Sequence, residues 1–245
     1  MLRAIACSGR IDVHSYAKVK TKIGQFWVGC SPAGLAMISA AQNPNAAFES
    51  AYQKLLRVKP RQGSIPKSTI RAIQDAVAGR PFNPVSIDLS SLSGFQSEVL
   101  KKLAKIPRGE VRPYSWLARE AGRPKAARAV GNIMARNPIP FLIPCHRVVP
   151  ASGGVGNYGL GSALKRELLL REGAPVDEIE SLQRKGVRYI GNRTTRIFCF
   201  PACPKMRSLK PTSRVHFANT SEAHQAGFRS CRRCRPVFPF FHLCR

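Results

Sequence analysis

The first 90 residues carry two kinds of hydrophobic pattern. Between residues 11 and 40, short apolar runs of strand length are separated by turn-forming residues, which predicts a small β-meander. In residues 46–58 and 68–78 the apolar positions recur every three or four residues, which predicts two helices. The sequence therefore predicts an α/β domain over residues 1–92. Three isolated side chains in this segment have no assigned chemistry: Cys7, His14 and Cys30.

A helical pattern begins at Ser93. Its apolar residues form one stripe along the helix. Two shorter helices are predicted at residues 116–121 and 125–136. Ser115 would cap the first of them, and Pro124 would open the second. Two short helices joined by a tight turn form a helix-turn-helix pattern, although an ordinary pair of antiparallel helices has the same pattern. The second helix favours DNA, because its basic residues alternate with small residues that let the backbone approach a duplex: Lys125, Ala126, Ala127, Arg128, Ala129 and Arg136.

The composition indicates a polyanionic partner. The chain has 245 residues, with 40 Lys and Arg against 13 Asp and Glu, and its formal net charge is +27. Such a charge attracts nucleic acid but names no reaction. There is no apolar run of about 18 residues, and the first residues lack the order of a signal peptide. We therefore expect a cytoplasmic protein, associated with the nucleoid if it is bacterial, with no membrane partner.

Four of the eight cysteines have the spacing of a metal site. Cys199 and Cys203 are four residues apart, and Cys231 and Cys234 form a CxxC pair. Four thiolates in this pattern are typical of tetrahedral zinc, whereas disulfides, the alternative, are disfavoured in a reducing compartment. The sequence thus predicts one zinc ion in a separate, small α+β domain over residues 188–238. The apolar tail after it, with Cys244, has no assigned function.

A fifth cysteine, Cys145, stands directly before a histidine. A thiol becomes a strong nucleophile only when it is deprotonated, so it needs a neighbouring base or cation. His146 can act as that base if a carboxylate orients it, and Glu172 is the candidate carboxylate. For an isolated cysteine, an inert buried role is the alternative. The glycine-rich loop at residues 152–159 suits close backbone approach to a ligand.

The segments around this cysteine resemble a known family. The string PCHRV at residues 144–148, with RAVGN at 128–132 before it and GNY at 156–158 after it, closely resembles the O6-alkylguanine-DNA alkyltransferases. The resemblance covers residues 95–174. It implies a ribonuclease-H-like N-terminal domain over residues 1–92 and an α-helical winged helix-turn-helix catalytic domain over residues 93–174.

The resemblance also implies the chemistry of the site. Cys145 would be the acceptor thiolate, with His146 deprotonating it through a water and Glu172 polarising His146. Asn137 would link the helix-turn-helix to this network. Tyr114 would aid extrusion of the nucleotide and protonate the leaving guanine.

DNA and base contacts are implied in the same way. Arg128 would fill the place that the extruded nucleotide leaves in the base stack, and the second helix, with Ala127, would lie in the minor groove. Three residues would wall the guanine pocket: Val148, Tyr158 and Gly159.

The zinc segment has a resemblance of its own. Residues 193–203 and 226–236 look like the Ada-type zinc domain, which takes methyl groups from DNA phosphotriesters onto its first cysteine ligand. The match implies that Cys199 is a second methyl acceptor. In bacterial Ada proteins this domain is N-terminal and joined to an AraC-type helix-turn-helix. Here it is C-terminal without such a partner, so phosphotriester repair or DNA binding is expected and transcriptional activation is not supported.

We therefore expect a DNA-repair methyltransferase that moves the alkyl group of O6-alkylguanine, with O4-alkylthymine as a candidate second substrate, irreversibly onto Cys145. The expected partner is double-stranded DNA containing alkylated bases, the expected state is a monomer, and no organic cofactor is expected. A non-catalytic protein that binds alkylated DNA and a transcription regulator are the alternatives. The thiol at position 145 argues against the former, because lesion-binding relatives that cannot transfer lack it.

Overall fold

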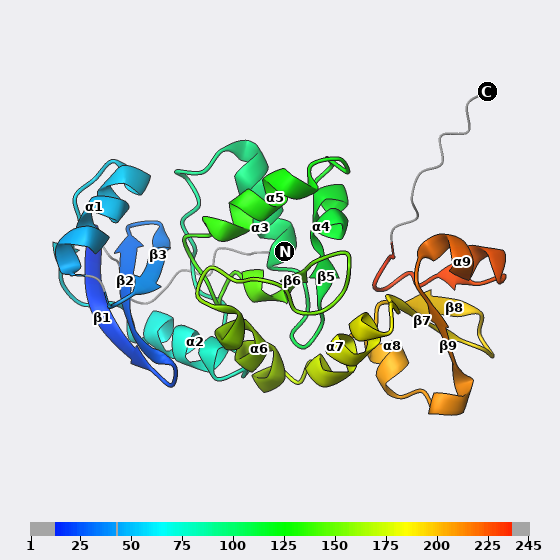
Figure 1. Ribbon diagram of the computed structural model, residues 1–245. Helices are drawn as coiled ribbons and strands as arrows, with labels where there is room; N and C mark the ends of the chain where they lie inside the picture. Colours follow the sequence, from blue (N-terminus) through cyan, green and yellow to red (C-terminus); the bar gives the residue numbers. More distant parts are fainter. Residues whose placement is uncertain (1–12, 43, 237–245) are drawn as a thin grey trace, which may run out of the picture. The chain divides into compact units, whose positions relative to one another are not determined.

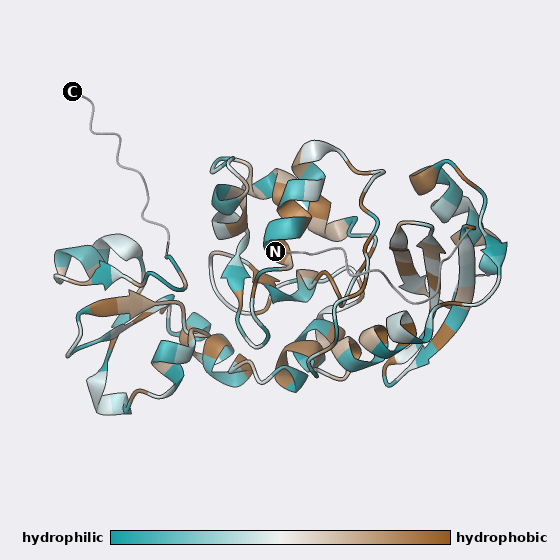
Figure 2. Cartoon of the chain, turned by 180° about the vertical axis from the view of Figure 1, so that it is seen from behind, coloured by the Kyte–Doolittle hydropathy of each residue, from teal (hydrophilic) through white to brown (hydrophobic). Residues whose placement is uncertain are grey.

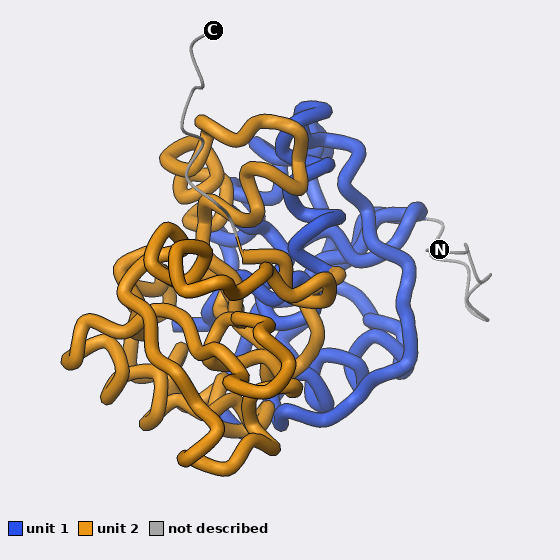
Figure 3. Tube along the Cα trace, turned by 90° about the vertical axis from the view of Figure 1, so that its right-hand side faces the viewer, with its two compact units in different colours: residues 1–104, 136–145 blue, residues 105–135, 146–245 orange. Residues whose placement is uncertain are grey.

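The structure, a computed structural model, describes residues 13–42 and 44–236. Cys7 and the tail with Cys244 lie outside the described residues. The chain divides into two compact units (Figure 3), one formed by residues up to Ala104 together with Arg136–Cys145, the other by Lys105–Ala135 together with the residues from His146 onward. The peptide bond between Cys145 and His146 is thus one of the points where the chain passes from one unit to the other.

The first unit contains the predicted meander as a four-stranded sheet of order β3-β2-β1-β4 (Figure 1). Strands β1 (Ser15–Thr21), β2 (Gly24–Ser31) and β3 (Gly34–Ala40) are antiparallel, and the short β4 (Arg61–Gln62) runs parallel to β1. The unit also contains three helices: α1 (Asn45–Leu56), α2 (Lys67–Val77) and α3 (Gly94–Leu103). The strands and helices predicted from the periodicity are all present, and Ser93 caps α3 through a capping box with Gln96.

The core of this sheet is aromatic, with Tyr16, Trp27, Phe48 and Tyr52 all buried. The loop segment 136–145 of the same unit packs on the sheet: the rings of Phe26 and Phe141 meet edge to face at 5.1 Å, and the Ile38 amide donates to the Pro138 carbonyl at 2.7 Å. The segment that ends in Cys145 is therefore anchored by main-chain and aromatic contacts.

In the second unit, two short helices, α4 (Tyr114–Glu120) and α5 (Ala127–Ala135), pack on each other. Strand β5 (Arg112–Pro113) pairs in parallel with β6 (Val148–Val149). Helices α6 (Ser162–Arg171) and α7 (Val176–Arg184) follow. The acidic cluster of Asp177, Glu178 and Glu180, which the sequence indicates to be a linker or a terminal helix, lies in the helix α7.

Three local predictions were wrong. Ser115 lies inside α4 rather than capping it, because the helix already begins at Tyr114. Pro124 lies in a separate turn, and α5 starts only at Ala127. The prolines Pro138, Pro140 and Pro144 predict an extended, edge-like path before Cys145, but this run is a series of turns that leads into a 3-10 helix, η1 (Cys145–Arg147).

The C-terminal part of the second unit is a small α+β fold, as expected. Its sheet has the order β10-β8-β7-β9, built from β7 (Tyr189–Asn192), β8 (Ile197–Cys199), β9 (Arg214–Phe217) and β10 (Arg229–Ser230). Its helices are α8 (Pro204–Arg207), the 3-10 helix η2 (Pro211–Ser213) and α9 (Thr220–Gln225). Three phenylalanines and Ala223 form its core: Phe198, Phe217 and Phe228. Apolar and polar residues alternate along the elements of both units (Figure 2). Within the described part of the chain, no helix is long and apolar enough to cross a membrane.

Candidate active site and candidate metal centre

Cys145 is held by an asparagine from the turn before it. The Cys145 residue is 6% exposed at the start of η1. The Asn137 side-chain amide donates to Sγ of Cys145 at 3.2 Å and to the Ile143 carbonyl at 2.8 Å, while its oxygen accepts from the Ile139 amide at 3.1 Å. This pattern fixes the rotation of the amide, so its N–H points at the sulfur. A hydrogen bond to the sulfur stabilises the thiolate over the thiol.

The next residue, His146, is paired with Glu172. Its Nε2 donates to Oε1 of Glu172 at 2.9 Å, and both residues are buried. Arg147 binds both oxygens of the same carboxylate, at 2.9 Å from Nε and 2.7 Å from Nη2. The Gly109 amide donates to Oε2 at 3.3 Å. Glu172 is therefore held from three directions and cannot turn away from the imidazole.

The charges of this group are set by burial and by these contacts. Burial would raise the pKa of Glu172, but the hydrogen bonds from His146 and Arg147 lower the pKa of its carboxyl to about 2. Burial lowers the pKa of His146 below its usual value, against the opposing effect of Glu172. At neutral pH the pair is a neutral imidazole beside a carboxylate. With Nε2 donating, Nδ1 is the acceptor atom, and it has no hydrogen-bond partner among the described residues. This is the state of a general base.

The low pKa of Glu172 predicts a pH-dependent stability. Because the pKa is lower in the folded than in the unfolded chain, the stabilisation is fully present above about pH 4.5 and is lost as the pH falls towards 2. The size of the shift corresponds to about 3 kcal/mol. We expect Glu172→Gln to lose this dependence in urea unfolding measured between pH 2 and 7. Glu167→Gln, on the exposed face of the preceding helix, should keep the wild-type profile. Equal profiles for wild type and Glu172→Gln would contradict the prediction.

Sequence reasoning missed Lys165, which is fully buried in α6. Its ammonium donates to the carbonyls of Val148 at 2.7 Å and Asn157 at 3.2 Å. It ties the strand after the reactive segment to the glycine-rich loop. A lysine in a helix with several charged residues reads as a surface residue, so no signal in a single sequence marks it.

The remaining predicted residues lie on α4, α5, β6 and the loop after β6. Tyr114 is the first residue of α4, and Ala127 and the exposed Arg128 begin α5. Val148 is buried in β6, and the Tyr158 ring meets the His146 ring edge to face at 6.5 Å. Gly159 is exposed. The contacts described above bring together the cysteine with its asparagine, and the imidazole with its carboxylate. They do not include Tyr114, Arg128, Ala127 or Gly159.

The structure also brings the four predicted ligand sulfurs together. Ligand atoms of Cys199, Cys203, Cys231 and Cys234 all lie within 4.8 Å of one another, and all four residues are buried. Zinc–sulfur bonds of about 2.3 Å in a tetrahedron put sulfurs ~3.8 Å apart, so the spacing fits. The two pairs come from different elements, since Cys199 ends β8 and Cys203 precedes α8 while the CxxC pair follows β10.

The electrostatics of the quartet suit a bound cation. The hydrogen bond with Cys203 raises the pKa of the Cys199 thiol. Hydrogen bonds with the other three thiols raise the pKa of Cys234, whereas those from Cys199 and Cys234 lower the pKa of Cys203 to about 2. Four thiolates this close coexist only around a metal ion, and the buried sulfur donors suit zinc. The zinc, when bound, keeps all four sulfurs deprotonated.

Comparisons with known proteins find two matching domains in this chain. Residues 94–174 match the family model for the DNA binding domain of 6-O-methylguanine DNA methyltransferase, and residues 182–237 match the metal binding domain of Ada. Together with the sulfur quartet, the second match identifies one zinc site.

Among curated proteins, the chain is similar to methylated-DNA--protein-cysteine methyltransferase of Rattus norvegicus, with 44% identity over 119 residues, which covers 48% of this chain and 56% of the relative. The corresponding human protein is 59% identical over 80 residues, covering 32% and 39%. The chain thus spans about half or less of the length of these relatives.

A solved structure extends the likeness to the fold. The crystal structure of Mycobacterium tuberculosis O6-methylguanine methyltransferase is 31% identical, with a TM-score of 0.55, and the match covers 65% of this chain and 92% of that chain. Because the match includes nearly the whole of that protein, the likeness is not confined to one motif. This α/β chain with a C-terminal cysteine cluster therefore belongs to the 6-O-methylguanine DNA methyltransferase family.

Proposed function

We propose that this chain repairs double-stranded DNA by moving the alkyl group from O6 of guanine onto Sγ of its own Cys145. The observation that carries the proposal is the sequence of contacts at two consecutive residues, in which Asn137 donates to the sulfur and Glu172 orients the imidazole next to it. A carbon–sulfur bond forms and the carbon–O6 bond breaks. The thioether has no route back to a thiolate, so one chain repairs one lesion.

His146 acts as the base. Its Nδ1 takes the thiol proton through a water, and the ionised Glu172 stabilises the imidazolium that results. Arg147 keeps that carboxylate charged and in place. The N–H of Asn137 stabilises the thiolate until it attacks.

The leaving guanine needs a proton and a pocket. Guanine departs poorly as an anion, so the Tyr114 hydroxyl at the start of α4 protonates it. Val148, Tyr158 and Gly159 wall the base, and Lys165 holds the carbonyls of Val148 and Asn157 at the spacing described above. The same pocket would admit O4-alkylthymine, which presents a similar alkylated oxygen.

Access to O6 requires that the nucleotide leaves the base stack, at a cost of a few kcal/mol. Helices α4 and α5 act as a helix-turn-helix in which α5, with the small Ala127, enters the minor groove, while the exposed Arg128 fills the vacated place. β5 and β6 would be part of the wing of this domain. A solved Mycobacterium tuberculosis OGT structure in complex with DNA, 31% identical to this chain, supports a DNA partner.

We further propose the bounds of three domains: a ribonuclease-H-like domain over residues 1–92, the catalytic domain over 93–174 and the zinc domain over 188–238. Residues 237 and 238 lie outside the described residues. The protein would act as a monomer, since a single chain holds both the acceptor and its base. Its proposed location is the cytoplasm.

Arg128→Ala should slow repair of an O6-methylguanine duplex by about 1–3 kcal/mol of activation free energy, or roughly 5- to 150-fold, because unstacking is then uncompensated. Reaction with the free alkylated base should change less than twofold, since nothing is extruded. Arg123→Ala, in the turn before α5, is the control for lost charge. Equal losses on both substrates would show that Arg128 does not fill the stack.

The proposed transfer is tested by mass spectrometry of the full chain after reaction with an O6-methylguanine duplex. One methyl per chain, mapped to the Cys145 peptide, is expected. A non-catalytic lesion binder is the second candidate, and it would bind the duplex with no mass change at Cys145.

For the zinc domain we propose a second transfer, from a methyl phosphotriester to Cys199. A zinc-bound thiolate is already deprotonated, so the metal replaces the base that Cys145 needs. Methylating one sulfur also relieves part of the negative charge of the quartet. Burial does not distinguish the four ligands, and the choice of Cys199 comes from its match to the first cysteine of the Ada pattern. Arg193, Arg196, Arg232 and Arg233 would attract the phosphate backbone.

The test uses Cys145→Ala protein and DNA with methyl phosphotriesters but no O6 lesion. We expect one zinc per chain and methyl on Cys199. Zinc without methyl on any cysteine would leave this domain a DNA-binding module.

A further inference from the structure

Two arginines of the zinc domain contact two consecutive residues of the catalytic domain. Arg207, at the end of α8, donates to the carbonyl of Gly109 and, at 3.0 Å, to the carbonyl of Gly173. Arg233 donates to Oε1 of Glu110 at 2.8 Å from Nη2 and 3.3 Å from Nε. The turn at Gly109 and Glu110 is therefore bound from two sides by the zinc domain.

This turn is also where Glu172 is held. The Gly109 amide donates to the Glu172 carboxylate at 3.3 Å. Gly109 has a φ of +71°, and a Cβ at this position would lie 2.7 Å from the Glu172 carbonyl, so the two segments are in direct contact. Gly173, the other acceptor of Arg207, directly follows Glu172. Among the described residues, the hydrogen bonds of Arg207 to the catalytic domain thus lie beside the carboxylate that orients His146.

Glu110 leads to the other side of the reactive segment. Its side chain is 1% exposed and pairs with the equally buried Arg112 at 2.5 Å. Arg112 pairs through β5 with Val148 in β6, three residues after Cys145. The turn therefore connects both to Glu172 and, through β5, to β6.

The zinc ligands set the positions of both arginines. Cys203 is the residue directly before α8, the four-residue helix that carries Arg207. Arg233 lies between the ligands Cys231 and Cys234. With zinc bound, the two short segments are cross-linked through the metal. Without zinc, the four buried sulfurs cannot all be ionised, and no bond through the metal holds the two segments in place.

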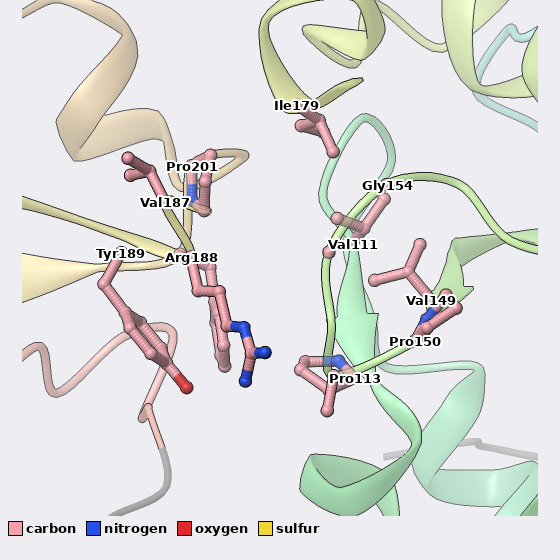
Figure 4. Close-up of a pocket in the computed structure, with 13 residues that line it drawn as sticks. Val111, Pro113, Val149, Pro150, Gly154, Ile179, Val187, Arg188, Tyr189 and Pro201 are labelled. Carbon is pink, nitrogen blue, oxygen red and sulfur yellow. The ribbon is translucent and has the colours of Figure 1, made fainter. Parts of the chain in front are cut away.

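Polar contacts carry much of this docking. Ala202 packs into an apolar cluster of the catalytic domain, but beside it lies an open cleft (Figure 4). Pro113, Val149 and Pro150 line one side of the cleft, and Arg188 and Tyr189 line the other. In a chain of net charge +27, two basic domains repel each other. Carboxylates of the catalytic domain and α7 offset this repulsion by facing arginines of the zinc domain: Glu110 with Arg233, Glu120 with Arg235, and Glu178 with Arg214.

We propose that Arg207 and Arg233 are positioning residues for Glu172, so that the zinc centre supports the activation of Cys145. This inference rests on the proposed role of His146 and Glu172 at that thiol. It adds a function to the zinc domain that needs neither phosphotriester transfer nor DNA contact.

The test measures the thiolate of Cys145 without DNA. Full-length protein is treated with iodoacetamide from pH 5 to 9, and the rate at Cys145 is followed by peptide mapping. Arg207→Ala and Arg233→Ala should each slow the reaction at pH 7 about tenfold and move the pH profile up by about one unit, in the range found when the partners of a site residue are removed. Lys205→Ala, in α8, and Arg229→Ala, two residues before Cys231, are matched controls, because each removes an exposed charge next to one of the two segments, and they should stay within twofold of wild type. The charged groups near His146 besides Glu172, namely Arg147 and Lys165, are unchanged in all four variants.

Zinc removal supplies the second readout. Each variant should retain one zinc, which shows that the loss is not metal loss. Chelation of wild type should lower the Cys145 rate to that of the Arg207→Ala/Arg233→Ala double variant, whereas chelation of the double variant should change nothing further. Arg207→Lys keeps a hydrogen-bond donor and should recover part of the rate at Cys145. That recovery would show that the slow reaction of Arg207→Ala comes from the missing donor and not from a folding defect.

Two results would overturn the inference: variants that match their controls, or a double variant that slows on chelation as much as wild type does. Failure of the proposed function itself is a different outcome. It would appear as wild-type protein that reacts with iodoacetamide at Cys145 but takes no methyl from an O6-methylguanine duplex.

Discussion

Cys145→Ala is expected to abolish alkyl transfer from O6-alkylguanine while leaving affinity for duplex DNA unchanged. The substitution removes the only atom to which the alkyl group is bound in the proposed reaction, so no residual rate through the same path is possible. The site should survive, because a buried alanine leaves only a small cavity and Asn137 keeps its bonds to the Ile143 carbonyl and the Ile139 amide. The measurement is protein mass after incubation with an O6-methylguanine duplex, beside a binding titration.

Cys30→Ala is the matched control. Like Cys145, Cys30 is a buried cysteine, and it lies in the strand β2. The Cys30→Ala variant should still accept one methyl at Cys145 and retain it. Repair by Cys145→Ala at a rate near that of the control would refute the assignment of the acceptor.

Cys231→Ser is expected to lose the zinc and to unfold the described part of the zinc domain. A segment of about 50 residues with a core of three phenylalanines is too small to be stable alone. Structural zinc contributes an apparent ~10–16 kcal/mol to the folding of comparable small domains, so the loss of one ligand exceeds what the core can supply. Zinc content and hydrogen exchange of the peptides that contain β7, β8 and β9 are the measurements.

The sheet of β1, β2 and β3 should keep its protection in that variant, because its aromatic core is complete without the zinc domain. Cys30→Ser, which also replaces a buried cysteine, should keep one zinc per chain. Slow exchange throughout β7 to β9 in zinc-free Cys231→Ser protein would mean that the core of this domain does not depend on the metal.

Features that depend on short sequence spacing could be predicted from the sequence. The alternation in β1 to β3, the helical stripe of α3 and the spacing of the four cysteines each extend over a few residues, and their physical cause acts over the same distance. Helix starts were less predictable. Ser115 and Pro124 both have the residue type of a helix start, yet α4 begins earlier and α5 later, because packing between the two helices overrides the local preference.

The contacts that depend on distant segments could not be predicted. The sequence offers Glu172 as the candidate carboxylate for His146, and the family resemblance implies the same pairing, whereas neither predicts the contacts of Glu172 with Arg147 and Gly109. Lys165 and Glu110 are charged residues that are normally exposed. Their burial follows only from the carbonyls and arginines that surround them in the folded chain.

The two partners of some of these contacts lie far apart in the sequence, and this has a consequence for the order in which they are synthesised. Gly109 and Glu110 meet their arginines only after a further 98 and 123 residues of chain. A ribosome adds about 5–20 residues per second, so the reactive cysteine is made several seconds before Arg233. On the docking proposed above, a nascent chain that ends shortly after Glu172 carries the acceptor thiol without the support of its carboxylate. The thiol would then reach its full reactivity only when synthesis is nearly complete, which protects an acceptor that can be used once from being consumed before the protein has folded.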